Sequence, residues 1–296
     1  MRILVCGAGG MLGHKLCQVL SLRFEVFATV RKQVSDYDRF NLFNPKHLLG
    51  GIDGRRAGDI LTAFAWAKPD VVLNAAGIVP QREPTDVIEY LEVNSVLPHR
   101  LALACQSCGA RLIHFSTDCV FSGRRGGYTE DIPADTSEVY GLTKLLGEVR
   151  GGRTLTIRTS MIGRELCTRQ GLLEWFLAKR NGRCLGYARA SFSGLTTLSL
   201  ARVTGDILEK HSDLHGLYHV SADPISKYDL LGLVNDAFGL GIALEPDTKV
   251  VCDRSLDSTR FREATGWRPD TWGAMISELR KDPTLYDLWA DERAAS

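Results

Sequence analysis

The chain starts with a short apolar run that leads directly into a cluster of glycines. Residues 3–6 have the composition of a buried strand, and Gly7, Gly10 and Gly13 follow at intervals of three. Residues 11–22 then show the apolar period of an amphipathic helix. Glycines between a strand and a helix let the backbone approach a pyrophosphate, and the helix N-terminus favours its negative charge. This feature predicts a parallel α/β sheet that binds a dinucleotide beside its first strand.

The rest of the pattern alternates strands with helices. Further strands are expected at residues 24–30, 71–73, 112–115, 153–158 and 216–220, helices at 59–67, 85–108, 137–149, 172–180, 198–210 and 227–238, and a glycine- and serine-rich loop around 191–197. Parallel strands need crossover connections, which the intervening helices provide. We therefore predict the α/β class: a Rossmann-type, doubly wound parallel sheet with a smaller, mixed α/β C-terminal substrate domain.

The same alternation predicts the domain organisation. We expect residues 1–160 to form the dinucleotide-binding domain, to which the chain returns at residues 198–220. Residues 161–197 and 221–296 are expected to form the substrate-binding domain. The C-terminal stretch 286–296 packs either on a partner or on its own domain, and the sequence does not decide between these two arrangements.

Charge and cysteine content exclude several classes of protein. Lys and Arg number 36 and Asp and Glu 35, which indicates neither a nucleic-acid partner nor a polybasic membrane anchor. No apolar run is long enough to cross a bilayer, and we expect no signal peptide before the first strand. The eight cysteines are scattered, and Cys105 and Cys108 lack a second ligand pair. We expect a cytoplasmic protein without nucleic-acid or membrane partners and without a metal site.

The end of the second expected strand bears on the choice of dinucleotide. An NAD-specific site has a carboxylate there, which bonds the ribose 2′-hydroxyl. This chain has Arg31 and Lys32 instead, and two cations suit a 2′-phosphate. NADP, as NADPH, is therefore the expected cofactor. The alternative, two charges solvated on a loop, leaves NAD open.

A tyrosine and a lysine four residues apart mark a candidate catalytic helix. On a helix Tyr140 and Lys144 share one face. A phenol has a pKa of about 10, so it exchanges protons at neutral pH only when a nearby cation stabilises the phenolate. Ser116 and Thr117 follow the strand at 112–115, at the carboxyl end where parallel sheets bind ligands. A hydroxyl there can hold a carbonyl beside the tyrosine, which predicts carbonyl reduction.

Four ordered motifs resemble a known superfamily. GAGGMLG, NAAG at residues 74–77, STD at 116–118 and YGLTK at 140–144 occur in the order found in extended short-chain dehydrogenase/reductases. The longer runs HFSTDCVFSG, VYGLTKLLGE and IRTS are most similar to the dTDP-4-dehydrorhamnose reductase family. The resemblance implies NADPH-dependent reduction of the 4-keto group of a 4-keto-6-deoxy nucleotide sugar, in the synthesis of surface-polysaccharide precursors. It leaves a homodimer open.

The resemblance also assigns roles to residues. It implies that Tyr140 is the general acid, that Lys144 lowers its pKa, and that Thr117, rather than Ser116, orients the substrate oxygen. The dinucleotide contacts that it implies, together with those argued above, are Gly7, Gly10, Met11, Leu12 and Gly13 at the pyrophosphate, Arg31 and Lys32 at the ribose, Asn41 and Leu42 at adenine, and Ala75, Ala76, Gly77, Tyr140 and Lys144 at the nicotinamide half. Asn94 matches an asparagine that the family places behind the active site; the alternative is a polar residue on a helix surface.

Departures from the family pattern leave the sugar open. Cys119 stands where the related 4,6-dehydratases have a glutamate, and a thiol with a pKa of about 8.5 replaces that acid poorly. Met161 and the loop at 191–197 differ from the rhamnose-type reductases, so another 4-keto sugar is open, and Lys227 and Arg254 are candidate partners for its diphosphate.

Two other functions stay under consideration. One is a nucleotide-sugar epimerase, and the other is a non-catalytic regulatory subunit that binds a dinucleotide. The complete set of Thr117, Tyr140 and Lys144 argues against the regulatory subunit.

Overall fold

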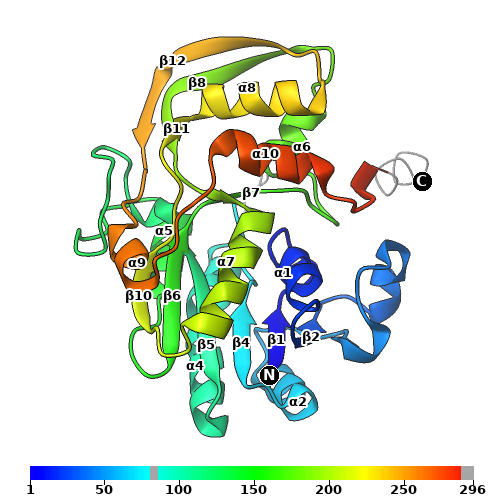
Figure 1. The fold of residues 1–296 in the computed structure, drawn as a ribbon. Helices are drawn as coiled ribbons and strands as arrows, with labels where there is room; N and C mark the ends of the chain where they lie inside the picture. The colour runs from blue at the N-terminus through cyan, green and yellow to red at the C-terminus, as the bar shows by residue number, and fades with distance from the viewer. Residues whose placement is uncertain (81–85, 288–296) are drawn as a thin grey trace.

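A parallel sheet forms the centre of the larger layer of the molecule (Figure 1). The computed structural model describes residues 1–80 and 86–287. Within them, seven strands pair in the order β10-β6-β5-β4-β1-β2-β3, and every neighbouring pair is parallel. The strands are β1 (Arg2–Cys6), β2 (Glu25–Thr29), β3 (Leu48–Leu49), β4 (Val71–Asn74), β5 (Arg111–Thr117), β6 (Thr154–Thr159) and β10 (Gly216–His219). The order reverses between β1 and β4, the switch point where such sheets bind ligands.

Helices cover both faces of this parallel sheet. Helices α1 (Gly13–Leu20) and α7 (Thr197–Lys210) lie on one face, and α2 (Ala57–Ala67), α4 (Leu97–Cys108) and α5 (Val139–Leu146) lie on the other. Alternate residues of each strand point to opposite faces. Val5 accordingly packs in the core under α1, whereas Leu4 packs in the core under α2 and α4. The predicted doubly wound sheet is confirmed.

The smaller layer holds a mixed sheet (Figure 1). Its strands, in the order β11-β8-β12, are β11 (Ile225–Ser226), β8 (Arg183–Phe192) and β12 (Ala243–Asp253). β12 pairs in parallel with β8, and β11 pairs with it antiparallel. Helices α6 (Leu172–Leu177), α8 (Lys227–Phe238) and α10 (Trp272–Lys281) lie between this mixed sheet and the larger layer, and α9 (Thr259–Thr265) packs beside β10. The expected mixed α/β substrate layer is present.

The expectations for single elements fail mainly in this layer. The loop expected around 191–197 is wrong, because β8 runs to Phe192 and β9 (Leu195–Thr196) pairs with β7 (Met161–Ile162). β12 was not expected at all, since its residues are mostly exposed and lack a regular apolar alternation. The two layers also share one apolar core, which joins Leu200 of α7 to Phe192 and Leu230. The domain boundaries stay a prediction.

The helix expected at 85–108 is interrupted by a turn of a different type. Its described part consists of α3 (Val87–Tyr90), the π-helical turn η3 (Leu91–Val96) and α4, which ends at Gly109 as expected. Thr85 lies outside the described residues. A π-helical turn inserts an extra residue into a helix and is frequent at functional sites.

Candidate active site at the carboxyl end of the parallel sheet

The glycine-rich turn is packed tightly between β1 and the segment after β4. Gly7 has φ +84°, and a Cβ atom there would lie 2.8 Å from Cα of Ala76. A Cβ on Gly13 would lie 2.1 Å from the Gly7 carbonyl oxygen, so side chains are excluded at both positions. A Cβ on Gly10 would meet only backbone oxygens, at 3.3 and 4.0 Å. The turn is therefore a backbone cradle at the start of α1, which fits a pyrophosphate.

The cations expected near the ribose lie directly after β2. Arg31 and Lys32 are both exposed, and Arg31 keeps 68 % of its side chain accessible although it pairs with Glu89 at 3.6 Å. The amide of Ala8 donates to the Thr29 carbonyl at 3.0 Å, which joins the glycine-rich turn to the end of β2. Both cations therefore follow a strand end that is joined to the glycine-rich turn, and their contact with a 2′-phosphate stays a prediction.

The structure does not bring both expected adenine contacts to the turn. Asn41 is exposed with φ 47°, whereas Leu42 lines a pocket with Cys17 along the second half of α1. Tyr37, in the 3₁₀ helix η1 (Val34–Phe40), lies at the turn instead, because a Cβ on Gly9 would be 2.7 Å from its hydroxyl. Burial raises the pKa of Tyr37 to about 12. No local sequence pattern indicated this tyrosine.

Ala75, Ala76 and Gly77 continue the chain after β4 and border the turn. The amide of Ala75 donates to the Cys6 carbonyl at 3.0 Å, and the amide of Ala76 donates to Asn74 Oδ1 at 3.2 Å. These bonds keep the segment against β1. The segment therefore borders the glycine-rich turn, and its contact with a nicotinamide stays a prediction.

Asn94 joins this segment to α5. It lies in the π-helical turn η3 and is completely buried, so the surface alternative is wrong. Its Nδ2 donates to the Ile78 carbonyl at 2.9 Å, and its Oδ1 accepts from the Ile78 amide at 2.9 Å. The same Nδ2 lies 3.4 Å from Thr143 Oγ1 on α5. One buried side chain thus sets the distance between the segment after β4 and the catalytic helix.

Thr117, Tyr140 and Lys144 meet at the carboxyl end of β5. Thr117 is the last residue of β5, and its Oγ1 accepts the amide hydrogen of Cys119 at 3.1 Å. The same hydroxyl donates to Asp118 Oδ1 at 3.2 Å, and it lies close enough to Tyr140 on α5 to lower the pKa of the phenol. The ammonium group of Lys144 donates to the Phe115 carbonyl at 2.7 Å. The three side chains predicted to be catalytic therefore belong to one cluster.

The electrostatics of this cluster are set by burial. Burial lowers the pKa of Lys144 to about 8, against the opposing effect of Glu148. Burial also raises the pKa of Tyr140, as does Cys119, while the nearby Thr117 hydroxyl lowers it. At neutral pH the tyrosine is therefore a protonated donor and the lysine is cationic. That Lys144 lowers the tyrosine's pKa stays a prediction.

Ser116 belongs to a different network under the site. Its hydroxyl donates to Glu148 Oε1 at 2.8 Å, and the same carboxylate pairs with Arg158 at 2.6 Å. All three side chains are buried. Ser116 is thus engaged in the core, which leaves Thr117 as the hydroxyl at the candidate site.

The candidate diphosphate cations lie on the other side of Thr117. Arg254 Nη1 lies 3.4 Å from Cys119 Sγ, and its Nη2 pairs with Glu138 at 2.5 Å. Arg254 and Lys227 both oppose the effect of burial, which raises the pKa of Asp118. Both cations therefore lie close enough to Asp118 to affect its pKa, and Arg254 already has a carboxylate partner.

The described residues contain neither a membrane-spanning helix nor a cluster of metal-binding side chains. Among residues 1–80 and 86–287, no helix is long and apolar enough to cross a bilayer. In those same ranges, no three or more His, Cys, Asp or Glu side chains are grouped so that they could hold a metal ion.

The doubly wound sheet, the glycine-rich turn and the Thr–Tyr–Lys cluster together define an extended short-chain dehydrogenase/reductase. More narrowly, the chain belongs to the RmlD substrate binding domain family, whose sequence model matches residues 1–248.

Relatives and solved structures agree with this assignment. The spore coat polysaccharide biosynthesis protein SpsK of Bacillus subtilis (strain 168) is 29% identical over 301 residues, which cover 95% of this chain and 97% of the relative. A dTDP-4-dehydrorhamnose reductase of Aggregatibacter actinomycetemcomitans is 27% identical over 308 residues, covering 94% and 98%. The dTDP-4-dehydrorhamnose reductase of Bacillus anthracis str. Ames, solved in complex with NADP, has a TM-score of 0.78 at 18% identity and covers 94% and 98%.

Proposed function

We propose that this protein is an NADPH-dependent reductase of the 4-keto group of a 4-keto-6-deoxy nucleotide sugar, acting in the synthesis of surface-polysaccharide precursors. The observation that carries the proposal is the Tyr140 phenol, which lies beside Thr117 at the sheet edge where the glycine-rich turn lies. The similarity to a dTDP-4-dehydrorhamnose reductase and to a spore coat polysaccharide biosynthesis protein over nearly the whole chain supports the substrate class.

The proposed mechanism needs one proton donor and one orienting group. A bound nicotinamide dinucleotide would supply the hydride. Tyr140 gives its phenolic proton to the carbonyl oxygen, which converts the ketone to an alcohol. Its raised pKa keeps that proton in place until the oxygen becomes basic. Thr117 holds the oxygen beside the phenol, and Lys144 places a positive charge beneath the site.

The cofactor would lie along the glycine-rich turn. Gly7, Gly10 and Gly13 allow its pyrophosphate to approach the backbone, and Arg31 and Lys32 lie where they would meet a 2′-phosphate. These cations support NADPH over NADH. We expect Arg31→Ala to raise KM for NADPH about tenfold and to leave KM for NADH unchanged. An equal rise for both cofactors would contradict the proposed role of Arg31.

The test of the reaction compares Tyr140→Phe with a matched tyrosine variant. NADPH oxidation is followed with a panel of 4-keto-6-deoxy nucleotide sugars, and the product is identified by its gain of two hydrogens in the mass spectrum. Tyr140→Phe is expected to lower kcat by about 10²- to 10⁴-fold. Tyr218→Phe is the control, because Tyr218 packs against Phe261 at the far edge of the parallel sheet. It should keep wild-type activity.

Other outcomes would replace the proposal. Conversion of a nucleotide sugar to its epimer without net NADPH oxidation would establish an epimerase. Binding of NADPH without turnover of any sugar in the panel would favour a regulatory subunit. An unchanged kcat for Tyr140→Phe would remove this tyrosine as the acid.

A further inference from the structure

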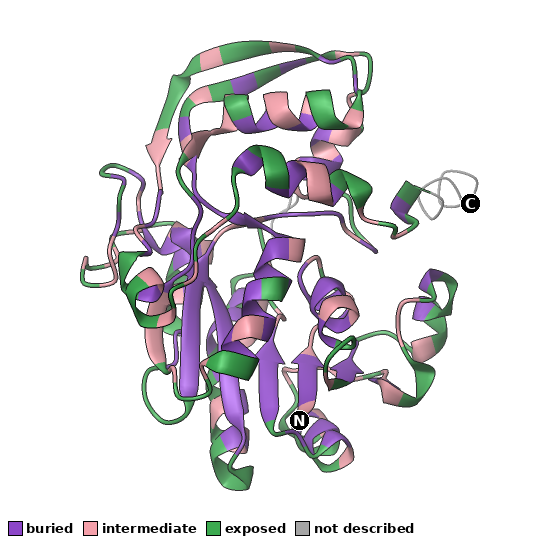
Figure 2. Ribbon diagram, in the orientation of Figure 1, coloured by how far each residue is buried: buried purple, intermediate pink, exposed green. Residues whose placement is uncertain are grey.

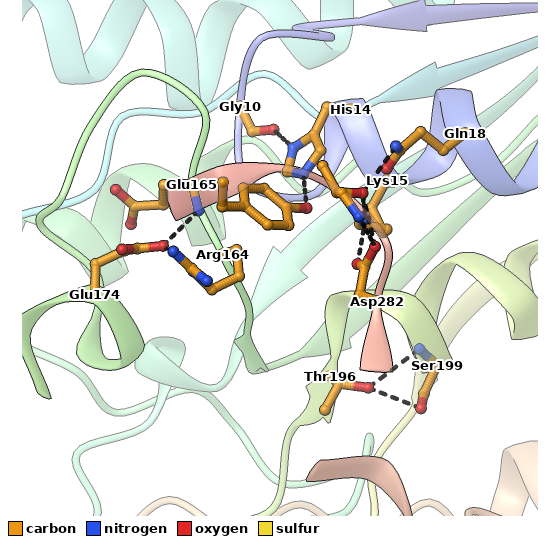
Figure 3. A network of polar contacts seen from close by, with 12 residues as sticks. Gly10, His14, Lys15, Gln18, Arg164, Glu165, Glu174, Thr196, Ser199 and Asp282 are labelled. Atoms are coloured by element: carbon orange, nitrogen blue, oxygen red, sulfur yellow. Dashed lines mark hydrogen bonds and ion pairs between the residues drawn. The ribbon is translucent and has the colours of Figure 1, made fainter. Parts of the chain in front are cut away.

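A buried histidine on α1 holds the glycine-rich turn in place (Figure 3). His14, the second residue of α1, is completely buried. Its Nδ1 lies 2.8 Å from the Gly10 carbonyl oxygen, and its Nε2 lies 2.7 Å from the Tyr286 hydroxyl. A carbonyl oxygen can only accept, so Nδ1 carries the hydrogen and Nε2 accepts from the tyrosine. Two hydrogen bonds thus run from Tyr286 through His14 to Gly10.

The surroundings of His14 keep the imidazole neutral, as this arrangement requires. Burial lowers its pKa to about 4, and the cation of Lys15 acts in the same direction. At neutral pH the ring therefore has one donor and one acceptor nitrogen, and each has a partner.

Further contacts bind the segment around Tyr286 to α1. Lys15 Nζ pairs with Asp282 at 2.5 Å, and the two side chains are only 3% and 7% exposed. Thr284 Oγ1 accepts from Gln18 Nε2 at 3.1 Å. We call residues 282–286 the C-terminal latch. Successive turns of α1 are therefore joined to this latch, which follows α10 in the chain.

A second segment of the substrate layer also reaches the turn. The guanidinium of Arg164 lies 4.8 Å from the centre of the Tyr286 ring and pairs with Glu174 at 2.7 Å. Farther along this segment, a Cβ on Gly171 would lie 2.8 Å from Cε of Met11 in the turn. The substrate layer thus contacts the dinucleotide-binding turn at two points.

Peptide geometry links these contacts to ligand binding. The Gly10 carbonyl accepts from His14 Nδ1 and also from the His14 amide, at 3.3 Å. In a planar trans peptide the N–H points opposite to the C=O. When His14 fixes the Gly10 carbonyl toward α1, it therefore also fixes the direction of the Met11 amide, a group expected at the pyrophosphate.

We propose that Tyr286, acting through His14, is a positioning residue of the dinucleotide site, so that the C-terminal latch sets the affinity for the cofactor. The proposal rests on the proposed dinucleotide binding and goes beyond it. It assigns part of that site to Tyr286, which lies 272 positions after His14 in the chain. Removal of the hydrogen bond between Tyr286 and His14 should loosen the turn and weaken cofactor binding, and it should leave the chemistry at Tyr140 unchanged.

The experiment measures NADPH binding by fluorescence titration of the full-length protein without sugar. Tyr286→Phe removes only the hydroxyl that donates to His14 Nε2. We expect the Kd for NADPH to rise about two- to tenfold. The loss should appear in KM for NADPH and not in kcat. His14→Asn keeps a donor near Gly10 but has no atom at the Nε2 position, so it should weaken binding similarly. The double variant should be no weaker than either single variant.

Tyr128→Phe is the matched control. Tyr128 is also buried, and its hydroxyl accepts a backbone amide hydrogen, from Arg125 at 3.2 Å, but it packs on Phe121 away from α1. It should lose a comparable amount of stability with no change in Kd. Hydrogen exchange gives a readout without cofactor: amides of residues 10–13 should exchange faster in Tyr286→Phe than in Tyr128→Phe.

The outcomes separate this proposal from the proposed function. If the wild type binds NADPH or NADH and Tyr286→Phe matches it in both Kd and exchange, the latch proposal is overturned. If the wild type binds neither dinucleotide, the proposed function fails, and the exchange comparison still decides whether the latch holds the turn. If Tyr286→Phe does not fold, Asp282→Asn loosens the same segment from Lys15 and carries the same expectation.

Discussion

The parallel sheet and the mixed sheet differ in how they bury their side chains (Figure 2). Every residue of β4, β5 and β6 is buried, whereas β8 alternates between buried and exposed residues and β12 is largely exposed. Thr117, Tyr140 and Lys144 lie in the larger layer, where polar groups keep fixed partners and shifted pKa values. One face of the mixed sheet packs on α8, and helices lie between this sheet and the larger layer. The strands of the parallel sheet therefore need buried residues throughout, whereas β8 of the mixed sheet needs them only at alternate positions.

The largest effect is expected for the buried ion pair under the catalytic helix. Arg158 bonds the Glu148 carboxylate through Nε and Nη2, at 2.6 and 2.8 Å. Arg158→Met leaves that buried carboxylate without its buried cation, so we expect a loss of about 3–5 kcal/mol in the free energy of unfolding, measured with urea. Arg150→Met is the control, because Arg150 is 67% exposed and lies 3.7 Å from the same carboxylate. It should cost less than about 1 kcal/mol. Equal losses would contradict the comparison.

The second prediction compares a glycine-to-alanine substitution in the larger layer with one in the smaller layer. Alanine at Gly13 would set a Cβ 2.1 Å from the Gly7 carbonyl oxygen, so Gly13→Ala should cost about 1–3 kcal/mol and weaken NADPH binding. A Cβ on Gly232, inside α8, would meet open space within 4 Å, so Gly232→Ala should stabilise by about 0.5–1 kcal/mol. Thermal unfolding and NADPH titration check both. Destabilisation by Gly232→Ala would show that the substrate layer is packed as tightly as the turn.

The larger and the smaller layer were not equally predictable from the sequence. Six of the seven parallel strands contain a short apolar stretch near turn residues, so local pattern indicates them in their order of appearance, whereas the two-residue β3 was not expected. β12 contains Pro246 and is mostly exposed, so no alternation marks it. Tyr140 and Lys144 were found because one helix carries both. The contact between His14 and Tyr286 joins residues 272 positions apart, and such a pairing exists only in the folded chain.

The third prediction uses the pH dependence that burial gives to the catalytic half. Burial lowers the pKa of Lys144 to about 8, so its positive charge is lost as the pH rises through that value. We expect kcat/KM to fall above pH 8 by up to about tenfold per pH unit. Lys144→Arg, which keeps its charge, should remove this descending limb while lowering the rate. A limb that persists in Lys144→Arg would assign it to another group.

Stability should change in the opposite direction over the same range. The folded-state pKa of Lys144 lies below its ordinary value, so the folded protein releases this proton first. The cost of holding a buried charge is present below pH 8 and is relieved between that pH and the ordinary pKa of about 10.4. The contribution of Lys144 to the free energy of unfolding therefore rises while activity falls. The difference between wild type and Lys144→Met in urea unfolding at several pH values measures it.

The smallest effect is expected on the outer face of the mixed sheet. Val251 in β12 is 60% exposed, so Val251→Thr should change the free energy of unfolding by less than about 0.5 kcal/mol. Val72 in β4 is completely buried between Leu4 and Leu112, and Val72→Thr should cost about 1–3 kcal/mol because its hydroxyl loses water. Urea unfolding of both variants measures the contrast directly. If Val251→Thr costs as much as Val72→Thr, then something covers this face in solution. A second copy of the chain would be the first candidate to test, by comparing the sedimentation of wild type and Val251→Thr, because a homodimer through this face would weaken in the variant.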